Sequence, residues 1–526
     1  MPAAPEHNPC KTLYFQVHGL QPSWVLQEEI CSPEFRLSPV SSKHERQVFY
    51  DTFDWHAFEK NVAVVKKKNA VSLISLDSGI ETESEAFQGY PASFFSSDLP
   101  EGAFREQLSA VSQIRAFQKY CTLETFVRTY RIVDDNEKTI GYLISESLTV
   151  IDKSGRKPLT SLLSLLPLKG YQDETDAFRK LLSRHITLEV SMDFRDVFRS
   201  IMQSAGRQVQ GYSSKIRLQL DPEAPVHESM RTLLIWALSI MKANEQGIRN
   251  NTDTEFLHDY RVAVRRTRSV MKLIKGVFDP DDCAPFLDGF RELGKKSNGL
   301  RDSDVYLLRQ HTFFGFLPSF LKPGLEQFFA EMERSRKAAH RSFCRYLASE
   351  SYGRFLHDWE RFLRTGTLPD LEKAPKASLS TISVAGSSIR KAWKKVIRTG
   401  RLIGPEANDQ ELHQLRIECK KLRYLLEFFA SLYPQKTIVP IIRQLKELQE
   451  NLGSFVDYSV QIMFLHERLQ TLRETGSNNL YPASIGGLVG VLHLKKEETR
   501  AHFTKTFRTF DQEKTRQMFR ELLDNE

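Results

Sequence analysis

Cationic side chains recur at helical spacing between Asn251 and Phe278. Intervals of three, four, three and four residues separate His258, Arg261, Arg265, Arg268 and Lys272. At about 100° per residue, these side chains share one helix face within an arc of roughly 100°. Solvated helix surfaces usually intersperse acidic residues with basic ones. No acidic residue falls in this arc, so the spacing predicts a helix face that binds an anion.

The same segment carries the signals of a helix that packs on one side. Thr252 with Glu255 three residues later predicts a capping-box start, and Gly276 predicts the end. The face beside the cations is apolar and comprises Leu257, Tyr260, Val264, Met271, Ile274 and Phe278. We therefore expect a helix whose apolar face packs and whose adjacent face presents a line of cations.

The pattern returns 155 positions later, in ELHQLRIECKKLRYLLEFF. The repeated cations are His413, Arg416, Lys420, Lys421 and Arg423, which correspond to His258, Arg261, Arg265, Arg266 and Arg268. The same offset relates Glu292-Leu293 to Glu447-Leu448, and Asp302 to Asp457. A register kept over about fifty residues indicates an internal duplication.

With these motifs, the chain resembles the CHAD domain family. The resemblance is carried by HDYRVAVRRTR, by RDSDV at Arg301–Val305 and by HQLRIECKKLRY, and it covers roughly residues 225–526. It implies an all-α domain of two pseudo-symmetric four-helix bundles, whose basic helices face a shared groove that binds inorganic polyphosphate. The residues themselves predict only a linear polyanion, for which the planar fork of arginine is a suitable donor.

Other cations are candidate extensions of this groove. Arg266 and Lys421 lie off the main stripes by roughly 100°. Two further helical stripes are Lys391, Lys394, Lys395 and Arg398 before His413, and Lys337, Arg341 and Arg345 on a long predicted helix. His258 and His413 are open to three roles: ligand contact, structural hydrogen bonding or phosphoryl acceptance. Asp302, Asp304 and Asp457 are expected to cap helices or to orient the arginines.

We expect residues 1–220 to form a separate α+β domain. Short β-branched or aromatic runs predict strands at Leu13–Val17, Gln47–Tyr50, Val62–Val65, Val71–Leu76, Phe126–Val133 and Ile140–Leu148. The segment Phe49–Gly79 resembles the CYTH or triphosphate-tunnel family, which implies a β-barrel. We predict a second domain at 222–526, with repeat halves 222–364 and 389–526 joined by the Ser/Thr/Pro-rich stretch 365–388.

The N-terminal domain departs from the tunnel family where chemistry would occur. Its first strand, KTLYFQVHG, has no carboxylate in place of the metal-binding ExExK pattern, Val64 stands for an arginine, and Asp77 stands for a lysine. A hard divalent cation needs oxygen ligands, and phosphoryl transfer needs such a metal or cations. We therefore predict no catalytic residues, no metal and no cofactor, and a degenerate tunnel kept as a scaffold. The alternative is a metal-dependent tri- or polyphosphatase in this domain.

The charge composition indicates which class of binding partner to expect. Lys and Arg number 26 and Asp and Glu 28 in residues 1–221, out of 74 and 66 in the chain. The C-terminal part is thus the basic one, which favours a polyanion as partner. Nucleic acid shares these electrostatics but is the less favoured partner, because the stripes lack interleaved aromatics for base stacking. Six scattered cysteines, no apolar run of membrane-spanning length and no signal-peptide pattern predict a cytoplasmic protein, with polyphosphate granules as a candidate location.

Overall fold

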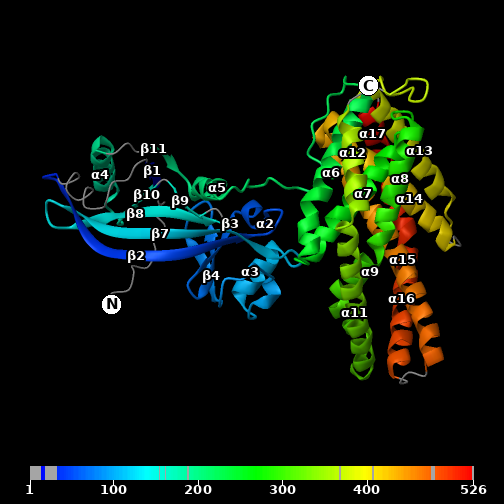
Figure 1. Cartoon of the computed structure of the whole chain (residues 1–526), viewed down its shortest axis with the longest axis horizontal. Coiled ribbons are helices and arrows are strands. Elements are labelled where there is room, and N and C mark those ends of the chain that lie inside the picture. The colour runs from blue at the N-terminus through cyan, green and yellow to red at the C-terminus, as the bar shows by residue number, and fades with distance from the viewer. Residues whose placement is uncertain are drawn as a thin grey trace. The chain divides into compact units, whose positions relative to one another are not determined.

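The computed structural model describes residues 13–17, 32–152, 155–159, 161–185, 189–365, 369–404, 408–475 and 480–523. The chain divides into two compact units, Met1–Ser213 and Ser214–Glu526. Strands dominate the first unit and helices make up the second (Figure 1).

The first unit is built on an antiparallel sheet. Its strands are β1 (Leu13–Val17), β2 (Phe35–Asp51), β3 (Val62–Lys67), β4 (Ala70–Ser75), β5 (Glu81–Ala86), β6 (Ser93–Phe94), β7 (Phe117–Asp134), β8 (Thr139–Asp152), β9 (Gly155–Pro158), β10 (Ser161–Pro167) and β11 (Glu189–Met192). The strand order is β11-β1-β10-β8-β7-β2-β3-β4-β5, with β6 paired to β7 and β9 to β8. The helices are α2 (His56–Glu59), α3 (Ala103–Val111), α4 (Gln172–His185) and α5 (Phe194–Ser204), with a 3₁₀ turn, η1, at Ser96–Asp98. All six strands predicted from the sequence are present.

The predicted barrel is not closed. Within the described residues, β5 and β11 end the strand order and no ladder joins them. The sequence of β5, ETESEA, places carboxylates along this edge, and charged side chains on an edge strand oppose further pairing. The expectation of a closed tunnel is therefore corrected to an open antiparallel sheet.

Both faces of the strands β2, β3 and β4 are covered. Alternate residues point to opposite faces of a strand, so Val64 and Val65 of β3 enter two different core clusters. α5 covers one cluster through Phe198, and α3 covers the other through Phe104. The position where the tunnel resemblance expects an arginine, Val64, is thus fully buried.

Lys66 is the first of three consecutive lysines, a basic run that on the sequence alone predicts a solvated strand end, but the structure differs at this residue. Its side chain is fully buried, and Nζ donates hydrogen bonds to the carbonyl oxygens of Lys68, at 2.7 Å, and of Phe87. An ammonium group is tolerated in the interior when its protons are bonded in this way.

The second unit is helical. Its helices are α6 (Val226–Arg249), α7 (Thr254–Leu273), α8 (Pro280–Lys296), α9 (Asn298–Leu308), α10 (Gln310–Phe316), α11 (Lys322–Leu347), α12 (Glu350–Arg364), α13 (Thr381–Leu402), α14 (Asp409–Phe428), α15 (Gln435–Thr475), α16 (Leu480–Phe510) and α17 (Glu513–Leu523), with 3₁₀ turns η2 (Ser319–Leu321) and η3 (Ala430–Leu432). α7 and α12 both pack against α6 and against α8, while α14 packs against α13 and α15. α11 and α15 each run along α16.

Helix boundaries keep the offset that relates the two basic segments. α7 and α14 begin 155 positions apart and end 155 positions apart, and the starts of α6 and α13, and of α8 and α15, differ by the same number. The N-caps also correspond. Asp253 accepts the N–H of Glu255 at 3.0 Å, and Asn408 accepts the N–H of Glu411 at 3.0 Å. The cap of α7 is therefore Asp253, one residue after the predicted Thr252.

α15 is one continuous helix, whereas α16 and α17 are separate helices. The start of α13 differs from the sequence prediction. α13 begins at Thr381, inside the stretch predicted as a connector. Thr381 is fixed by tertiary contacts: its N–H and its hydroxyl both donate to the carbonyl oxygen of Ala224, at 2.9 and 2.7 Å.

Two features bear on compartment and redox chemistry. None of the helices in the described ranges is both long and apolar enough to cross a bilayer. Cys121, Cys283, Cys344 and Cys419 are free thiols, and the remaining two cysteines lie outside the described residues.

Candidate functional site

α7 is held by its apolar face. Phe256, Leu257, Tyr260 and Val264 are buried, and the hydroxyl of Tyr260 lies 3.0 Å from that of Tyr352 on α12. Burial of these side chains fixes the rotation of the helix about its axis. The adjacent cationic face is therefore held toward α9 and α14, both of which pack against α7.

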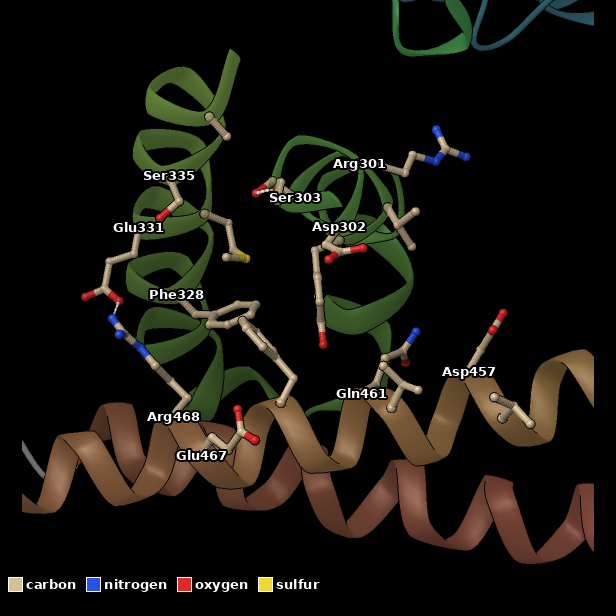
Figure 2. A pocket seen from close by; sticks show the side chains of 18 of the residues that line it. Arg301, Asp302, Ser303, Phe328, Glu331, Ser335, Asp457, Gln461, Glu467 and Arg468 are labelled. Atoms are coloured by element: carbon tan, nitrogen blue, oxygen red, sulfur yellow. Dashed lines mark hydrogen bonds and ion pairs between the residues drawn. The ribbon is translucent and has the colours of Figure 1, made fainter. Parts of the chain in front are cut away.

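A cavity of about 900 Å³ lies between α7, α9, α11, α14 and α15. Four of the residues predicted to bind the anion line it: His258, Arg261 and Arg265 from α7, and Arg416 from α14. Figure 2 shows the side of this cavity formed by α9, α11 and α15. The two basic helices therefore contribute to one cavity.

Arg261 is bound into the protein at the rim of this cavity. Its Nη1 donates to the carbonyl oxygen of Gly294, at 3.0 Å, and to the hydroxyl of Ser297, and its Nη2 donates to Asn298 Oδ1 at 2.9 Å. Burial, together with the charges of Arg265 and Arg301, lowers the pKa of Arg261 to about 10. The guanidinium remains charged at neutral pH, but most of its hydrogen-bonding capacity serves the junction of α8 and α9.

Lys420 marks where the two basic helices converge. Burial, followed by the nearby charges of Arg416, Arg265 and Arg423, lowers the pKa of Lys420 to about 8. Within the described part of the chain, neither Lys420 nor Arg265 forms an ion pair with a carboxylate. Like charges held this close destabilise the protein unless a negative charge comes between them. The arrangement is suited to an anion.

The next turns of both helices continue the cationic face beyond the cavity. Lys272 is exposed at the end of α7. Arg268 is half-buried, and its Nε lacks a hydrogen-bond partner, as does the Nε of Arg423. Arg423 lies 3.6 Å from Glu427, the first carboxylate along its face of α14.

Carboxylates also belong to this site. Five arginines and four carboxylates line the cavity, so its charge depends on which of them neutralise each other. Asp457 Oδ1 accepts from Arg416 Nη2 at 3.3 Å, and at the far end of the cavity Glu331 pairs with Arg468 (Figure 2). Burial raises the pKa of Asp302, although Arg261 and Arg301 oppose the shift.

Asp304 does not line the cavity. It is buried and accepts from Arg336 Nε at 2.6 Å, while Arg336 Nη2 donates to Asn251 Oδ1 at 2.8 Å. Asp304 and Asp457 therefore each bind an arginine, which is one of the two roles expected for them.

The remaining predicted cations lie outside the cavity. His413 is exposed on α14. Arg266 has its guanidinium 5.4 Å from the ring centroid of Trp236, donates to the carbonyl oxygen of Ser214 at 2.6 Å and lies 3.6 Å from Glu427. Its contacts are those of a packing residue between helices.

A second basic patch lies between α13 and α14. Lys395 and Lys421 both bind Glu418, at 3.0 and 2.9 Å. Burial alone would raise the pKa of Glu418, but the two lysines outweigh it and the pKa is lowered. Lys391, Lys394 and Arg398 are exposed on the same helix as Lys395 and line none of the cavity.

The stripe on α11 faces another way. Lys337 and Arg341 each follow a cavity-lining residue, Ser335 and Ala339, by two positions. Two positions correspond to about 200° around a helix, so these two cations lie on the opposite face from the cavity. Arg345 is exposed near the end of α11.

Several cavity residues were missed in the sequence. Arg301 belongs to the RDSDV motif, but the motif alone did not predict that its side chain lines the cavity. Tyr306 and Gln461 lie four residues after Asp302 and Asp457, and both pairs are 155 positions apart. The repeat register that relates Asp302 to Asp457 could therefore also have identified Tyr306 and Gln461. Nothing in the sequence marked Arg468, which enters only because α15 passes beside α11.

The first unit has a cavity of its own, on the sheet. It measures about 810 Å³, and its charged lining residues are Lys43, Lys67, Glu45, Glu81, Glu83 and Glu146. Burial raises the pKa of Glu146 to about 7, against the effect of Lys67. Across the described ranges, no group of three or more His, Cys, Asp or Glu side chains is placed to hold a metal ion.

Comparison with known proteins finds a family match within the second unit. Residues 232–466 match the model of the CHAD domain family. Two uncharacterized proteins of Mycobacterium tuberculosis, from strains CDC 1551 / Oshkosh and ATCC 25618 / H37Rv, are each 26% identical over 211 residues. That match covers 39% of this chain and 39% of each relative, so the chain spans about two fifths of the length of these curated relatives.

Two solved structures are also similar. The CHAD domain from the plant Ricinus communis is 24% identical, with a TM-score of 0.43, over 59% of this chain and 97% of that one. PptA from Streptomyces chartreusis is 14% identical, with a TM-score of 0.44, over 54% of this chain and 100% of that one. The repeated histidine-and-arginine motifs and the family match agree: residues 232–466, within the helical unit, match the CHAD domain family.

Proposed function

We propose that the helical unit binds inorganic polyphosphate, without catalysis, along the cationic faces of α7 and α14. The observation that carries this proposal is that Arg265 of α7 and Arg416 of α14 line one cavity. Beside them, burial and then the charges of Arg416, Arg265 and Arg423 lower the pKa of Lys420 to about 8, against the opposing effect of Asp457. A linear chain of phosphates offers a negative charge at each unit and no sequence to read. A rigid line of arginines and lysines is what such a ligand requires, since rigid donors lose little entropy on binding.

The proposed path of the ligand runs from the cavity outward. Arg265 and Arg416 would bind it inside, with His258 beside them, and Lys420, Arg423, Arg268 and Lys272 would bind the following phosphates. We further propose that the helices form two pseudo-symmetric four-helix bundles on either side of this path, in keeping with the 155-residue offset of their boundaries. The outer cations of α13 are a candidate extension, and a cytoplasmic location with access to polyphosphate granules would suit this ligand.

Competition binding tests the ligand class. Long-chain polyphosphate is expected to displace a labelled polyphosphate at a lower phosphate concentration than duplex DNA or RNA does. The reason is that every phosphate of the flexible chain can follow the cationic path, whereas a duplex fixes its own phosphate spacing. Fluorescence anisotropy at fixed ionic strength measures the displacement. Equal or stronger competition by nucleic acid would overturn the proposal.

Asp457 provides a prediction about the same path. Asp457→Asn is expected to tighten polyphosphate binding by about two- to fivefold, because the carboxylate that competes for Arg416 becomes neutral. Asp288→Asn on α8, which removes an exposed ion pair to Arg291, is the matched control and should leave the affinity unchanged. Titration calorimetry of both variants decides the matter. Weaker binding in Asp457→Asn would mean that Asp457 positions Arg416 for the ligand.

The alternative function, a metal-dependent tri- or polyphosphatase in the first unit, has no specific observation in its favour. It is tested directly by incubating the full chain with tripolyphosphate and Mg²⁺ or Mn²⁺. We expect no sustained release of phosphate. Turnover that continues past one equivalent per chain would establish the enzyme and contradict a purely binding role.

A further inference from the structure

The lining of the cavity in the helical unit changes from charged to mainly apolar within one helical turn. On α9, Asp302 is followed four residues later by Tyr306, and on α15, Asp457 is followed four residues later by Gln461. Four residues correspond to a rise of about 6 Å. Beyond this turn the walls carry the aromatic and aliphatic side chains Tyr306, Phe328, Met332, Val460 and Phe464, before the charged far end with Glu331, Glu467 and Arg468.

These aromatic rings are packed against one another. The ring centroid of Tyr306 lies 5.0 Å from that of Phe464 and 5.8 Å from that of Phe328. Val460 beside them is 52% exposed. An inorganic phosphate chain has no apolar atom with which to cover such a wall, so a bare polyphosphate would leave this half of the cavity unused.

Two polar groups in this apolar half lack partners. The hydroxyl of Tyr306 and the carbonyl oxygen Oε1 of Gln461 are both buried without a hydrogen bond, in side chains only 7% and 6% exposed. Buried polar groups are nearly always bonded, so such exceptions require an explanation. A ligand that brings both a donor and an acceptor would satisfy them. Figure 2 shows the Gln461 amide between α15 and Asp302 of α9, within the cavity.

We propose that this cavity takes an organic phosphate of the nucleotide class, with phosphates on Arg265 and Arg416 and a planar base against Tyr306 and Phe464. The inference rests on the proposed anion site for its charged end. The edge of the base is bonded to the Tyr306 hydroxyl and the Gln461 amide. A volume of about 900 Å³ is in the range of sites that enclose a small organic ligand.

Comparing nucleoside triphosphates with inorganic tripolyphosphate measures what the apolar half of the cavity contributes to binding. Calorimetric titration of the full chain with adenosine triphosphate, guanosine triphosphate and inorganic tripolyphosphate, at one ionic strength, compares their affinities. Tripolyphosphate carries at least as much negative charge, so a preference for a nucleotide can only come from the nucleoside. We expect at least one nucleotide to bind about tenfold more tightly than tripolyphosphate, as stacking on an aromatic side chain would provide.

One double variant tests whether the nucleotide preference comes from this cavity. Gln461→Leu with Tyr306→Phe keeps the volume and the rings but removes both polar groups. The double variant should lose at least half of the nucleotide preference, on a logarithmic scale, and keep its affinity for tripolyphosphate. Far-ultraviolet circular dichroism checks that it is folded, and removal of two unbonded polar groups is expected to leave its thermal midpoint unchanged or higher.

Each outcome decides one of the two proposals. Equal affinities for nucleotide and tripolyphosphate, or a nucleotide preference that survives in the double variant, would overturn the nucleotide site. If polyphosphate binds without any nucleotide preference, the nucleotide site fails and the proposed function stands. If a nucleotide binds and polyphosphate does not, the proposed function fails alone.

Discussion

Reversing the charges of Arg265 and Lys420 together, in Arg265→Glu with Lys420→Glu, is expected to reduce polyphosphate affinity at least about 100-fold. Arg265 lines the cavity from α7 and Lys420 lies beside it on α14. Neither forms an ion pair with a carboxylate in the described part of the chain, so the variant removes no such stabilising contact. Two glutamates at this point would repel the ligand where both helices meet it. Titration calorimetry with long-chain polyphosphate measures the loss.

The choice of these two residues comes from the structure. The stripes alone favour reversing Arg261 and Arg416, but Arg261 donates to Gly294 and Asn298, and Arg416 is paired with Asp457. Reversal of that pair would disturb the junction of α8 and α9 as well as the ligand site. A loss of binding there would not distinguish the two effects.

The matched control changes the same net charge elsewhere. Arg354→Glu with Arg361→Glu alters two exposed arginines of α12, whose side chains are 71% and 67% exposed in pairs with Glu350 and Asp358. Affinity should fall only slightly in the control, through the long-range loss of positive charge. Both variants should keep their helicity by circular dichroism. Retained affinity in Arg265→Glu with Lys420→Glu would move the binding path away from α7 and α14.

Replacing Lys420 by methionine is expected to raise the stability of the free protein and to weaken polyphosphate binding. The lowered pKa of Lys420, about 8 against the ordinary 10.5, means that the charged form is disfavoured in the folded state. Removing the charge should stabilise the fold by about 1 kcal/mol, after a discount for partial exposure. Methionine preserves the apolar stem and fills similar space. Chemical denaturation in the absence of ligand measures the gain.

The pH dependence of stability and of polyphosphate affinity, in wild type and in Lys420→Met, tests whether the charge of Lys420 causes these effects. Between about pH 8 and 10.5 the folded state has released the Lys420 proton while the unfolded chain retains it, so this group makes the wild type more stable as the pH rises. A bound anion raises the pKa of Lys420 again. Polyphosphate affinity should therefore be constant below pH 8 and fall above it, with uptake of a proton on binding.

Lys420→Met is the control for both pH effects, because it lacks the titrating group. In Lys420→Met the two pH effects that begin near pH 8 should be absent, because the next group of the site with a lowered pKa, Arg261, releases its proton only near pH 10. If the wild type and Lys420→Met show the same pH profile, Lys420 is not held among like charges as described. A variant less stable than wild type at pH 7 would lead to the same conclusion.

Local pattern was enough to predict the two basic helices. The spacing of His258, Arg261 and Arg265 determines which side chains share a face, since a helix turns by a fixed angle per residue. The 155-residue offset also held in the boundaries of α7 and α14 and in their N-caps, because a duplicated sequence repeats its start and stop signals. In the first unit, alternation and turn residues sufficed for the β7–β8 hairpin.

Spacing could not predict which cations act together. Arg266 and Lys421 belong to the same repeated motif, yet Arg266 packs on Trp236 and Lys421 binds Glu418, because neighbouring helices supply those partners. The closure of the sheet was also wrong in prediction, since the pairing of edge strands depends on long-range twist and not on local propensity.

The sequence by itself determined the repeat and the helical faces, because these follow from residue type and from the angle between successive residues. It also predicted a polyanion as the ligand, which remains a prediction. Only the tertiary structure decided that α7 and α14 meet at Arg265 and Lys420. It also decided that the Tyr306 hydroxyl and Gln461 Oε1 lack hydrogen bonds in the cavity that Arg265 lines. The physical reason is that charge repulsion and hydrogen-bond satisfaction depend on distances between segments far apart in the chain. Those distances are set by the packing of the apolar faces, to which residues from all the helices contribute.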